Sequence, residues 1–166
     1  MEADQKKTAL RMIPYGLYVL AAETENGVTA ATVNWVTQTS FDPPLIAVGI
    51  KADSPGYTIL KESGTFALSV LGKGQQDAAF AFFKPVERDG DNIGGQPFRT
   101  GSTGVPILAA ARAHVECRIV EVVETGDHHI FVGEVVDAGV NGDVEGRPDD
   151  ASLHMRDLGD KVFYGG

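Results

Sequence analysis

The sequence predicts a mainly β protein, built as an antiparallel β-barrel with short flanking helices. At least six segments have strand-like composition, and most of them are joined as hairpins. Two or three short helices lie between them, without an alternating β–α rhythm or a Gly-x-Gly-x-x-Gly motif. This argues against a parallel dinucleotide-binding sheet. The 20 glycines and 8 prolines also suit a fold with many tight turns.

The first half of the chain opens with a helix, followed by three strands. Residues 3–12 form a predicted short amphipathic helix. Residues 15–24 and 28–36 are predicted strands, rich in valine, tyrosine, threonine and aromatics. The turn Glu25-Asn26-Gly27 joins them, because Asn-Gly is a strong hairpin signal. After Asp42-Pro43-Pro44, the apolar run 45–50 is a predicted buried strand.

A second helix is expected to begin near Ser54. Ser54 is the expected N-cap and Pro55 the first helical residue, since both types favour those positions. Gly64 ends this helix, and residues 66–71 form the next strand.

The second half of the chain is dominated by one long hairpin. Residues 75–83 are a predicted helix, and residues 89–105 are a predicted glycine-rich loop. Two long strands, 114–123 and 128–138, pair through a short polar turn. A polar loop follows over 139–151.

Length and charge limit the function classes. The chain has 166 residues, which predicts a single domain over 1–166. With 14 Lys+Arg against 23 Asp+Glu, the net charge is −9. Such a surface repels phosphate backbones and anionic lipid, so we expect neither nucleic acid nor membrane as a partner. A small anionic ligand can still bind, but it needs a local positive charge or a group of N–H donors to hold it.

Cysteine and histidine content argues against a metal site. The single cysteine, Cys117, excludes an internal disulfide and any multi-cysteine site. It alternates in phase with Val115 and Ile119, which predicts a buried side chain. His128 and His129 are neighbours on a strand and face opposite sides, so they cannot bind one metal together.

The sequence predicts a cytoplasmic protein. No apolar run approaches the roughly 20 residues needed to span a bilayer. The N-terminal region has an apolar stretch, but Glu2 and Asp4 oppose the positive start of a secretion signal.

Two segments are candidates for ligand contacts. Residues 29–40 are polar for a strand: they indicate either a solvated face with a Ser/Thr turn, or backbone and hydroxyl groups facing a flat heteroaromatic ring. Residues 51–58 are explained by a capped helix start alone. Alternatively, the N–H groups of Gly56, Tyr57 and Thr58, with Lys51 nearby, form a phosphate site. Lys84, at the end of an aromatic helix, can also reach a phosphate.

From about Leu10 to Ala138, the order of segments resembles the flavin reductase-like, FMN-binding split-barrel family. The resemblance is carried by the motifs Thr29-Ala30-Ala31-Thr32, Ser40-Phe41-Asp42-Pro43-Pro44-Leu45, Ser54-Pro55-Gly56-Tyr57, Ser63-Gly64-Thr65-Phe66, Glu116-Cys117-Arg118, Gly126-Asp127-His128 and Val132-Gly133-Glu134-Val135.

This resemblance implies a homodimeric, six-stranded split barrel with FMN near the subunit interface. It implies that the strand lining the flavin ring contributes Thr32, Asn34, Trp35, Val36 and Thr37. It implies that the phosphate and ribityl chain are held by Lys51, Ser54, Tyr57 and Thr58, with Phe83 and Lys84 nearby. His128 stands at the family's Gly-Asp-His position, associated with a nicotinamide donor.

Two departures from the family pattern leave alternatives open. Val33-Asn34-Trp35 replaces the usual small residues and serine, so Trp35 is expected to cover or narrow the ring face. His129 stands where threonine or serine is common, so either His128 or His129 faces the site.

The resemblance implies electron transfer from NADH or NADPH through FMN to a flavin, a redox protein or a metal complex. An FMN electron carrier that no nicotinamide reduces directly is the alternative, and a binding module with a lost pocket is a third. A homodimer is also expected because Phe131, Val135 and Phe163 are apolar positions that need cover.

Overall fold

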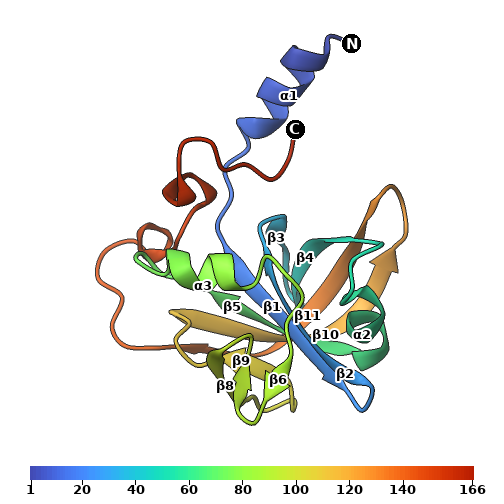
Figure 1. The fold of residues 1–166 in the computed structure, drawn as a ribbon, viewed down its shortest axis with the longest axis vertical. Coiled ribbons are helices and arrows are strands. Elements are labelled where there is room, and N and C mark those ends of the chain that lie inside the picture. Colours follow the sequence, from blue (N-terminus) through green and yellow to red (C-terminus); the bar gives the residue numbers. More distant parts are fainter.

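A computed structural model describes all 166 residues and shows a mainly β architecture (Figure 1). The main sheet is formed by β1 (Tyr18–Thr24), β2 (Gly27–Val33), β3 (Val36–Phe41), β4 (Pro44–Lys51), β5 (Thr65–Val70), β10 (Ala113–Val123) and β11 (His128–Val140). The small sheet is formed by β6 (Arg88–Asp89), β7 (Asn92–Ile93), β8 (Gln96–Thr100) and β9 (Pro106–Leu108). The helices are α1 (Ala3–Arg11), α2 (Tyr57–Ser63) and α3 (Gln76–Ala81), with short 3-10 helices η1 (Pro148–Ala151) and η2 (Met155–Leu158).

The main sheet has the strand order β2-β1-β5-β10-β11-β4-β3, and all its pairs are antiparallel. Its two edge strands, β2 and β3, are consecutive in the chain but do not pair with each other. The sheet therefore curls until its edges approach, and the barrel stays open between them. The predicted barrel class is confirmed.

The sheet has seven strands, one more than the six expected, because the predicted strand 28–36 ends early and a further strand, β3, follows it. β2 ends at Val33, and Asn34-Trp35 leads the chain across the opening into β3. The N–H of Val36 donates to the carbonyl of Asn34 at 3.1 Å, and the N–H of Gly49 donates to that of Trp35 at 2.9 Å. The ladder to β4 thus begins at once on the other edge.

Two other local expectations were wrong. The glycine-rich segment 89–105 is not a bare loop: it forms β7, β8 and the end of β6 in a four-stranded sheet with β9. Helix α2 begins at Tyr57, two residues later than expected, with Gly56 rather than Ser54 as its N-cap. No side chain caps this helix.

The core has two main parts. One fills the barrel and includes Val48, Leu60, Phe66 and Phe131. The other lies between the barrel, α3 and the small sheet, and Phe82 and Phe98 pack edge to face within it at 5.8 Å. Phe131 is fully buried, so the expectation that it needs a partner's cover was wrong.

Cys117 lies in the barrel core with no exposed surface, as the alternation predicts. Burial raises the pKa of its thiol to about 12, so the thiol is inert at neutral pH.

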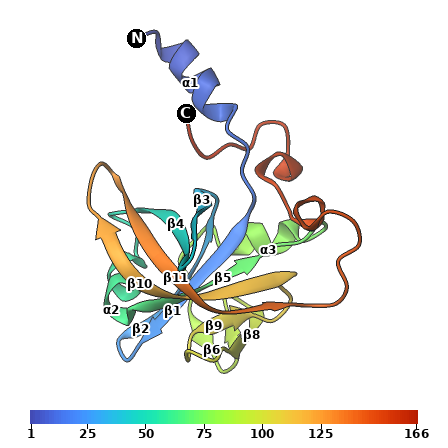
Figure 2. The same ribbon diagram turned by 180° about the vertical axis from the view of Figure 1, so that it is seen from behind.

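Helix α1 projects from the body, and the C-terminal residues run back beside it (Figures 1 and 2). None of its residues is buried. The Arg11 guanidinium lies 4.4 Å from the centre of the Phe163 ring, and its Nε donates to the carbonyl of Gly165 at 3.2 Å. These contacts tie the two ends of the chain together.

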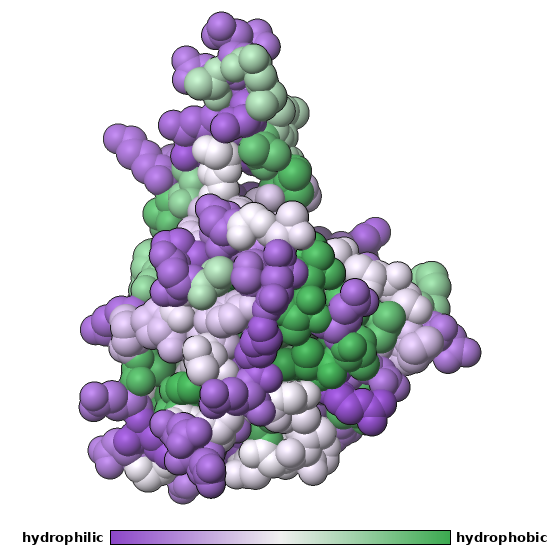
Figure 3. All heavy atoms as spheres, turned by 90° about the vertical axis from the view of Figure 1, so that its right-hand side faces the viewer, coloured by the Kyte–Doolittle hydropathy of each residue, from purple (hydrophilic) through white to green (hydrophobic).

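Apolar side chains also reach the surface, and Figure 3 shows them gathered in patches on one face. On the long hairpin they include Val120, Val123, Ile130 and Val136. No helix in the structure combines the length and apolar character needed to cross a membrane.

Candidate functional site

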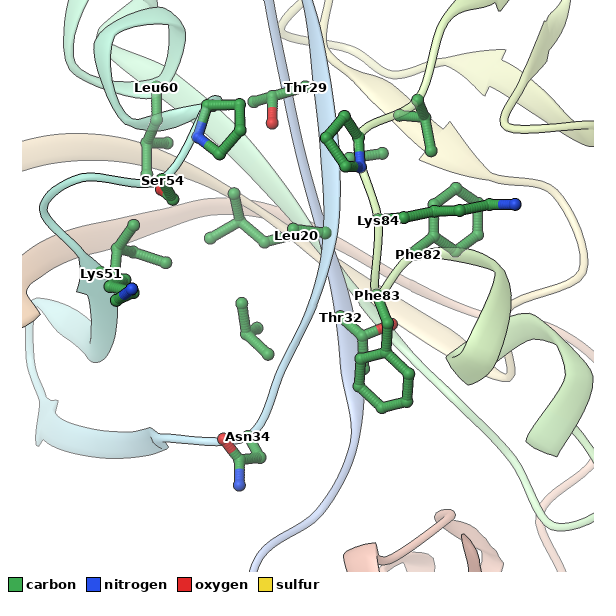
Figure 4. Close-up of a pocket in the computed structure, with 18 of the residues that line it drawn as sticks. Leu20, Thr29, Thr32, Asn34, Lys51, Ser54, Leu60, Phe82, Phe83 and Lys84 are labelled. Atoms are coloured by element: carbon green, nitrogen blue, oxygen red, sulfur yellow. The ribbon is translucent and has the colours of Figure 1, made fainter. Parts of the chain in front are cut away.

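A cavity of about 300 Å³ opens where the barrel is split (Figure 4). Its walls come from β2, the end of β4, the loop before α2 and the segment that follows α3. The volume is within the range of small-ligand sites. Seven residues predicted for the site line this cavity: Thr32, Asn34, Lys51, Ser54, Phe83, Lys84 and His128.

The remaining five predicted residues do not line the cavity: they are Trp35, Val36, Thr37, Tyr57 and Thr58. Val36 and Thr37 belong to β3 and pair with β4. The Thr37 hydroxyl is exposed and donates to the carbonyl of Gln38 at 3.2 Å. The predicted ring-lining strand from Thr32 to Thr37 is therefore interrupted, and only its first half faces the cavity.

Strand β2 offers backbone groups to the cavity because it is an edge strand. Alternate residues of a strand point their N–H and C=O groups to the same side. The N–H of Thr32 points away from β1 and donates to the carbonyl of Phe82 at 3.0 Å. By this alternation Ala30, two residues earlier, also turns its N–H and C=O toward the cavity. Such in-plane donors and acceptors suit the edge of a flat heterocycle.

Thr32 has a structural role as well as a place in the wall. Its hydroxyl donates to the carbonyl of Ala79 at 2.7 Å, which fastens α3 to the edge of the sheet. This hydroxyl is therefore engaged as a donor and can only accept from a ligand.

Gly56 forms a close cradle with Thr29 across the opening. A Cβ on Gly56 would lie against the Thr29 hydroxyl and only 2.7 Å from its Cβ. Lys51 and Ser54 flank the same loop, and the Lys51 ammonium is 3.1 Å from the Asp53 carboxylate. The hydrogen bond from Lys51 to Asp53 raises the pKa of Lys51, so its cation is present at neutral pH. The loop thus brings a glycine, a cation and a serine together at the cavity wall, a combination that suits a phosphate group.

The two predicted cations do not converge on this loop. Figure 4 shows the Lys84 side chain running away from Lys51 and Ser54, whereas Phe83 lies beside Thr32. Lys84 is exposed and makes no ion pair. Lys51 is thus the cation better placed for a phosphate at the Gly56 loop.

His128 stands at the rim, held from both sides. Its Nδ1 is 2.9 Å from the Asp127 carboxylate, and its Nε2 is 2.7 Å from the Tyr164 hydroxyl. The hydrogen bond from His128 lowers the pKa of Asp127, which is therefore ionised at neutral pH. An ionised carboxylate only accepts, so Nδ1 carries the proton. In the neutral ring Nε2 is then an acceptor, and Tyr164 donates to it.

Trp35 packs beside His128 rather than over the cavity. The two ring centroids are 4.6 Å apart, and the Tyr164 ring centroid is 5.5 Å from that of Trp35. A Cβ on Gly49 would lie 3.2 Å from the indole, so the indole packs closely on the backbone of β4. The indole Nε1–H is buried and has no hydrogen-bond partner.

His129 faces the other side of the barrel wall. Its Nδ1 is 2.6 Å from the Tyr57 hydroxyl, and Tyr57 also packs edge to face on Phe131 at 5.5 Å. Of the two histidines, only His128 lines the cavity. The hydrogen bond to His129 explains why the Tyr57 side chain, at the start of α2, points away from the cavity.

Sequence reasoning missed Tyr164 as a cavity residue, and it included Thr29 and Ala30 only in the broader candidate segment 29–40. The family resemblance places the ring further along the chain, from Thr32 to Thr37, than the part of this segment that lines the cavity. Nothing local marks Tyr164: it meets His128 from 36 positions away and Asn34 from 130.

Comparison with known proteins identifies a family. The model of the flavin reductase like domain matches residues 10–158. A probable flavin reductase of Rhizobium meliloti is 34% identical over 127 residues, which are 75% of this chain and 40% of that protein. The chain thus spans less than half the length of that relative.

Two solved structures share the fold at similar identity. The NADH:FAD oxidoreductase SgcE6 of Streptomyces globisporus, in complex with NAD and FAD fragments, has a TM-score of 0.69 and 34% identity. The match covers 77% of this chain and 76% of that one. An FMN-binding protein of Thermus thermophilus has a TM-score of 0.68 and 32% identity, with 77% and 71% covered.

Proposed function

The chain belongs to the flavin reductase like domain family and is an oxidoreductase, and from this premise we propose that it binds FMN and passes electrons from NADH or NADPH through it. Residues 1–166 act as one domain in this proposal. The acceptor we propose is a free flavin, which suits an open cavity rather than a closed one. The similar Streptomyces protein is named for a flavin acceptor of this kind.

One observation carries the proposal: the cavity joins an edge strand, a glycine cradle with a cation, and a rim histidine. The outward backbone groups of β2 suit the ring edge, and the Gly56 loop with Lys51 suits one phosphate. The cavity offers no second phosphate-binding group of residues beside the Gly56 loop, which favours FMN, with one phosphate, over FAD, with two. The similar FMN-binding protein of Thermus supports this choice.

When bound, FMN would supply the redox chemistry, which is hydride acceptance from a reduced nicotinamide and electron transfer to the acceptor. The chain's own residues bind and orient. β2 and Phe83 hold the ring, Lys51 and Ser54 hold the phosphate, and His128 at the rim orients the nicotinamide. No side chain needs to act as an acid or base at the reacting atoms.

Two measurements on freshly purified protein test this function. Mass spectrometry of the heat-released cofactor is expected to find FMN, and a predominance of FAD would overturn the choice of flavin. Anaerobic mixing of the flavin-loaded protein with NADH or NADPH is expected to bleach the flavin absorbance.

The contact between Tyr164 and His128 favours a second candidate, an FMN electron carrier that no nicotinamide reduces directly. The Tyr164 hydroxyl already occupies Nε2 of His128 at the rim. Absorbance that persists with both nicotinamides, but bleaches with dithionite, identifies the carrier.

A further inference from the structure

A second cavity, of about 370 Å³, lies between the end of α1 and the C-terminal residues. Its volume is also within the range of small-ligand sites. Met155 and Tyr164 are the only residues that line both cavities, so the two spaces are neighbours with otherwise separate walls. The proposed electron transfer makes no use of the second cavity.

The charged lining of the second cavity is mainly positive, although the chain as a whole has a net charge of −9. Two arginines, Arg11 and Arg156, stand against one carboxylate, that of Asp160. Arg156 is exposed and, like Asp160, makes no ion pair. The guanidinium of Arg156 is therefore free to bind an anion in this cavity.

Arg11 supplies further donors from a fixed position. Its Nε donates to the carbonyl of Gly165 at 3.2 Å, and its guanidinium lies 4.4 Å from the centre of the Phe163 ring. These contacts hold the side chain in place and leave its terminal NH₂ groups without a protein acceptor. A guanidinium offers parallel N–H donors that match the oxygens of a carboxylate or a phosphate. The cavity thus carries two such groups.

His154 lines the second cavity as well, but its side chain is engaged within the protein. Its Nε2 is 3.1 Å from the Ser152 hydroxyl, and the ring also accepts from the backbone N–H of Asp157 in a capping box. The positive character of the cavity therefore depends on the two arginines.

Aromatic and apolar side chains form most of the remaining wall. Tyr15 is half-buried against the core, whereas Phe163 and Tyr164 are 50% and 46% exposed. Exposed aromatic rings can stack on a flat ring or meet its edge. The other apolar side chains of the wall are Met12, Ile13, Pro14, Met155 and Val162. A wholly polar anion would leave this surface uncovered, so the wall favours a ligand that carries an aromatic ring beside its acid group.

We propose that the second cavity is a binding site for a small aromatic anion, whose carboxylate or phosphate is held by Arg156 and Arg11 and whose ring packs against Tyr15 and Phe163. This inference goes beyond the proposed function and does not depend on it. It predicts that both the charge and the flat ring of a ligand are needed for binding.

The test is calorimetric titration of the full chain as purified, with its bound flavin and with unbound flavin removed. The probes are naphthoate and naphthyl phosphate, and at least one is expected to bind once per chain while the flavin stays bound. The tighter of the two identifies the acid group. Naphthalenemethanol, which lacks the charge, and cyclohexanecarboxylate, which lacks the flat ring, are expected to bind at least about 10-fold more weakly.

Arg156→Gln is expected to weaken binding of the tighter probe by at least about 10-fold, because it removes a charge-assisted contact. Since Arg156 is exposed and unpaired, this variant should fold as wild type does. Lys161→Gln is the matched control and should bind normally: it removes an exposed cation from the same C-terminal region that does not line the cavity.

Three results would overturn the site. The first is that neither probe binds at millimolar concentration. The second is an equal loss of binding in Arg156→Gln and Lys161→Gln, which would indicate general charge attraction. The third is release of the bound flavin by the probe, measured by flavin absorbance after filtration, which would place the probe in the first cavity.

Discussion

His128 is the residue on which the proposed electron entry depends. It lines the cavity, whereas its neighbour His129 contacts Tyr57 on the other face of the wall. We expect His128→Ala to slow flavin reduction by about 5- to 150-fold, because losing one good polar contact costs about 1 to 3 kcal/mol. FMN affinity should stay nearly unchanged, since the residue lies at the rim.

His129→Ala is the matched control for this variant, and we expect its bound flavin to be reduced at the wild-type rate. Stopped-flow absorbance at the flavin band, with NADH and with NADPH, measures both variants. If flavin reduction is slow in His129→Ala and normal in His128→Ala, then His129, and not His128, is the residue that acts at the site.

Glu116 is a buried carboxylate that holds the loop between β8 and β9. It is 1% exposed and accepts from the N–H groups of Ser102 and Thr103 at 2.9 and 2.8 Å, and from both hydroxyls. Burial alone would raise the pKa of Glu116, but these hydrogen bonds outweigh burial and lower it. A lowered pKa stabilises the fold above the ordinary value of 4.5, and this contribution is lost as the pH falls through the folded-state pKa.

Glu116→Gln places an NH₂ group against donors and should cost about 1 to 3 kcal/mol at pH 7. The difference from wild type should shrink below pH 4.5 as wild-type Glu116 gains a proton. Urea unfolding at pH 7, 5, 4 and 3 measures this, with the exposed Glu121→Gln as control. A difference that stays constant with pH would contradict the role of the charge.

At the scale of elements, the approach of α2 to β2 shapes the cavity. Gly56 has φ −87°, which alanine adopts freely, so Gly56→Ala tests the contact with Thr29 alone. The added methyl must push the start of α2 away from β2. We expect a 5- to 150-fold loss of FMN affinity, which corresponds to about 1 to 3 kcal/mol of overpacking.

Flavin fluorescence titration of the apoprotein measures this loss. The double variant Thr29→Gly with Gly56→Ala relieves the clash from the other side and should recover much of the affinity. If Gly56→Ala alone binds FMN as wild type does, the cradle is not part of the flavin site.

At the scale of the whole molecule, the long hairpin offers a face for a second copy. Val123 and Ile130 are cross-strand partners and are 36% and 42% exposed. Phe131, next to them, is buried in the barrel, so the exposed pair lies on the outer face. We predict a homodimer that covers this pair, and Ile130→Asp should produce monomers, because it buries a charge in an apolar contact.

Sedimentation velocity at micromolar concentrations measures the mass of each variant. Val140→Asp, at the far end of β11 and 62% exposed, is the control and should remain dimeric. A monomeric wild type would contradict the homodimer, and a dimeric Ile130→Asp variant would place its interface elsewhere.

The sequence by itself determined the barrel class and the position of nearly every long strand, and it singled out Lys51 and Ser54, which line the cavity. These features depend on alternation, turn residues and motifs a few positions apart, which act locally. The tertiary structure decided where β2 breaks, which histidine lines the cavity, and that Tyr164 reaches His128. These depend on how the sheet curls until distant edges approach. No local pattern records a contact between residues 36 or 130 positions apart, because packing and strand register alone bring them together.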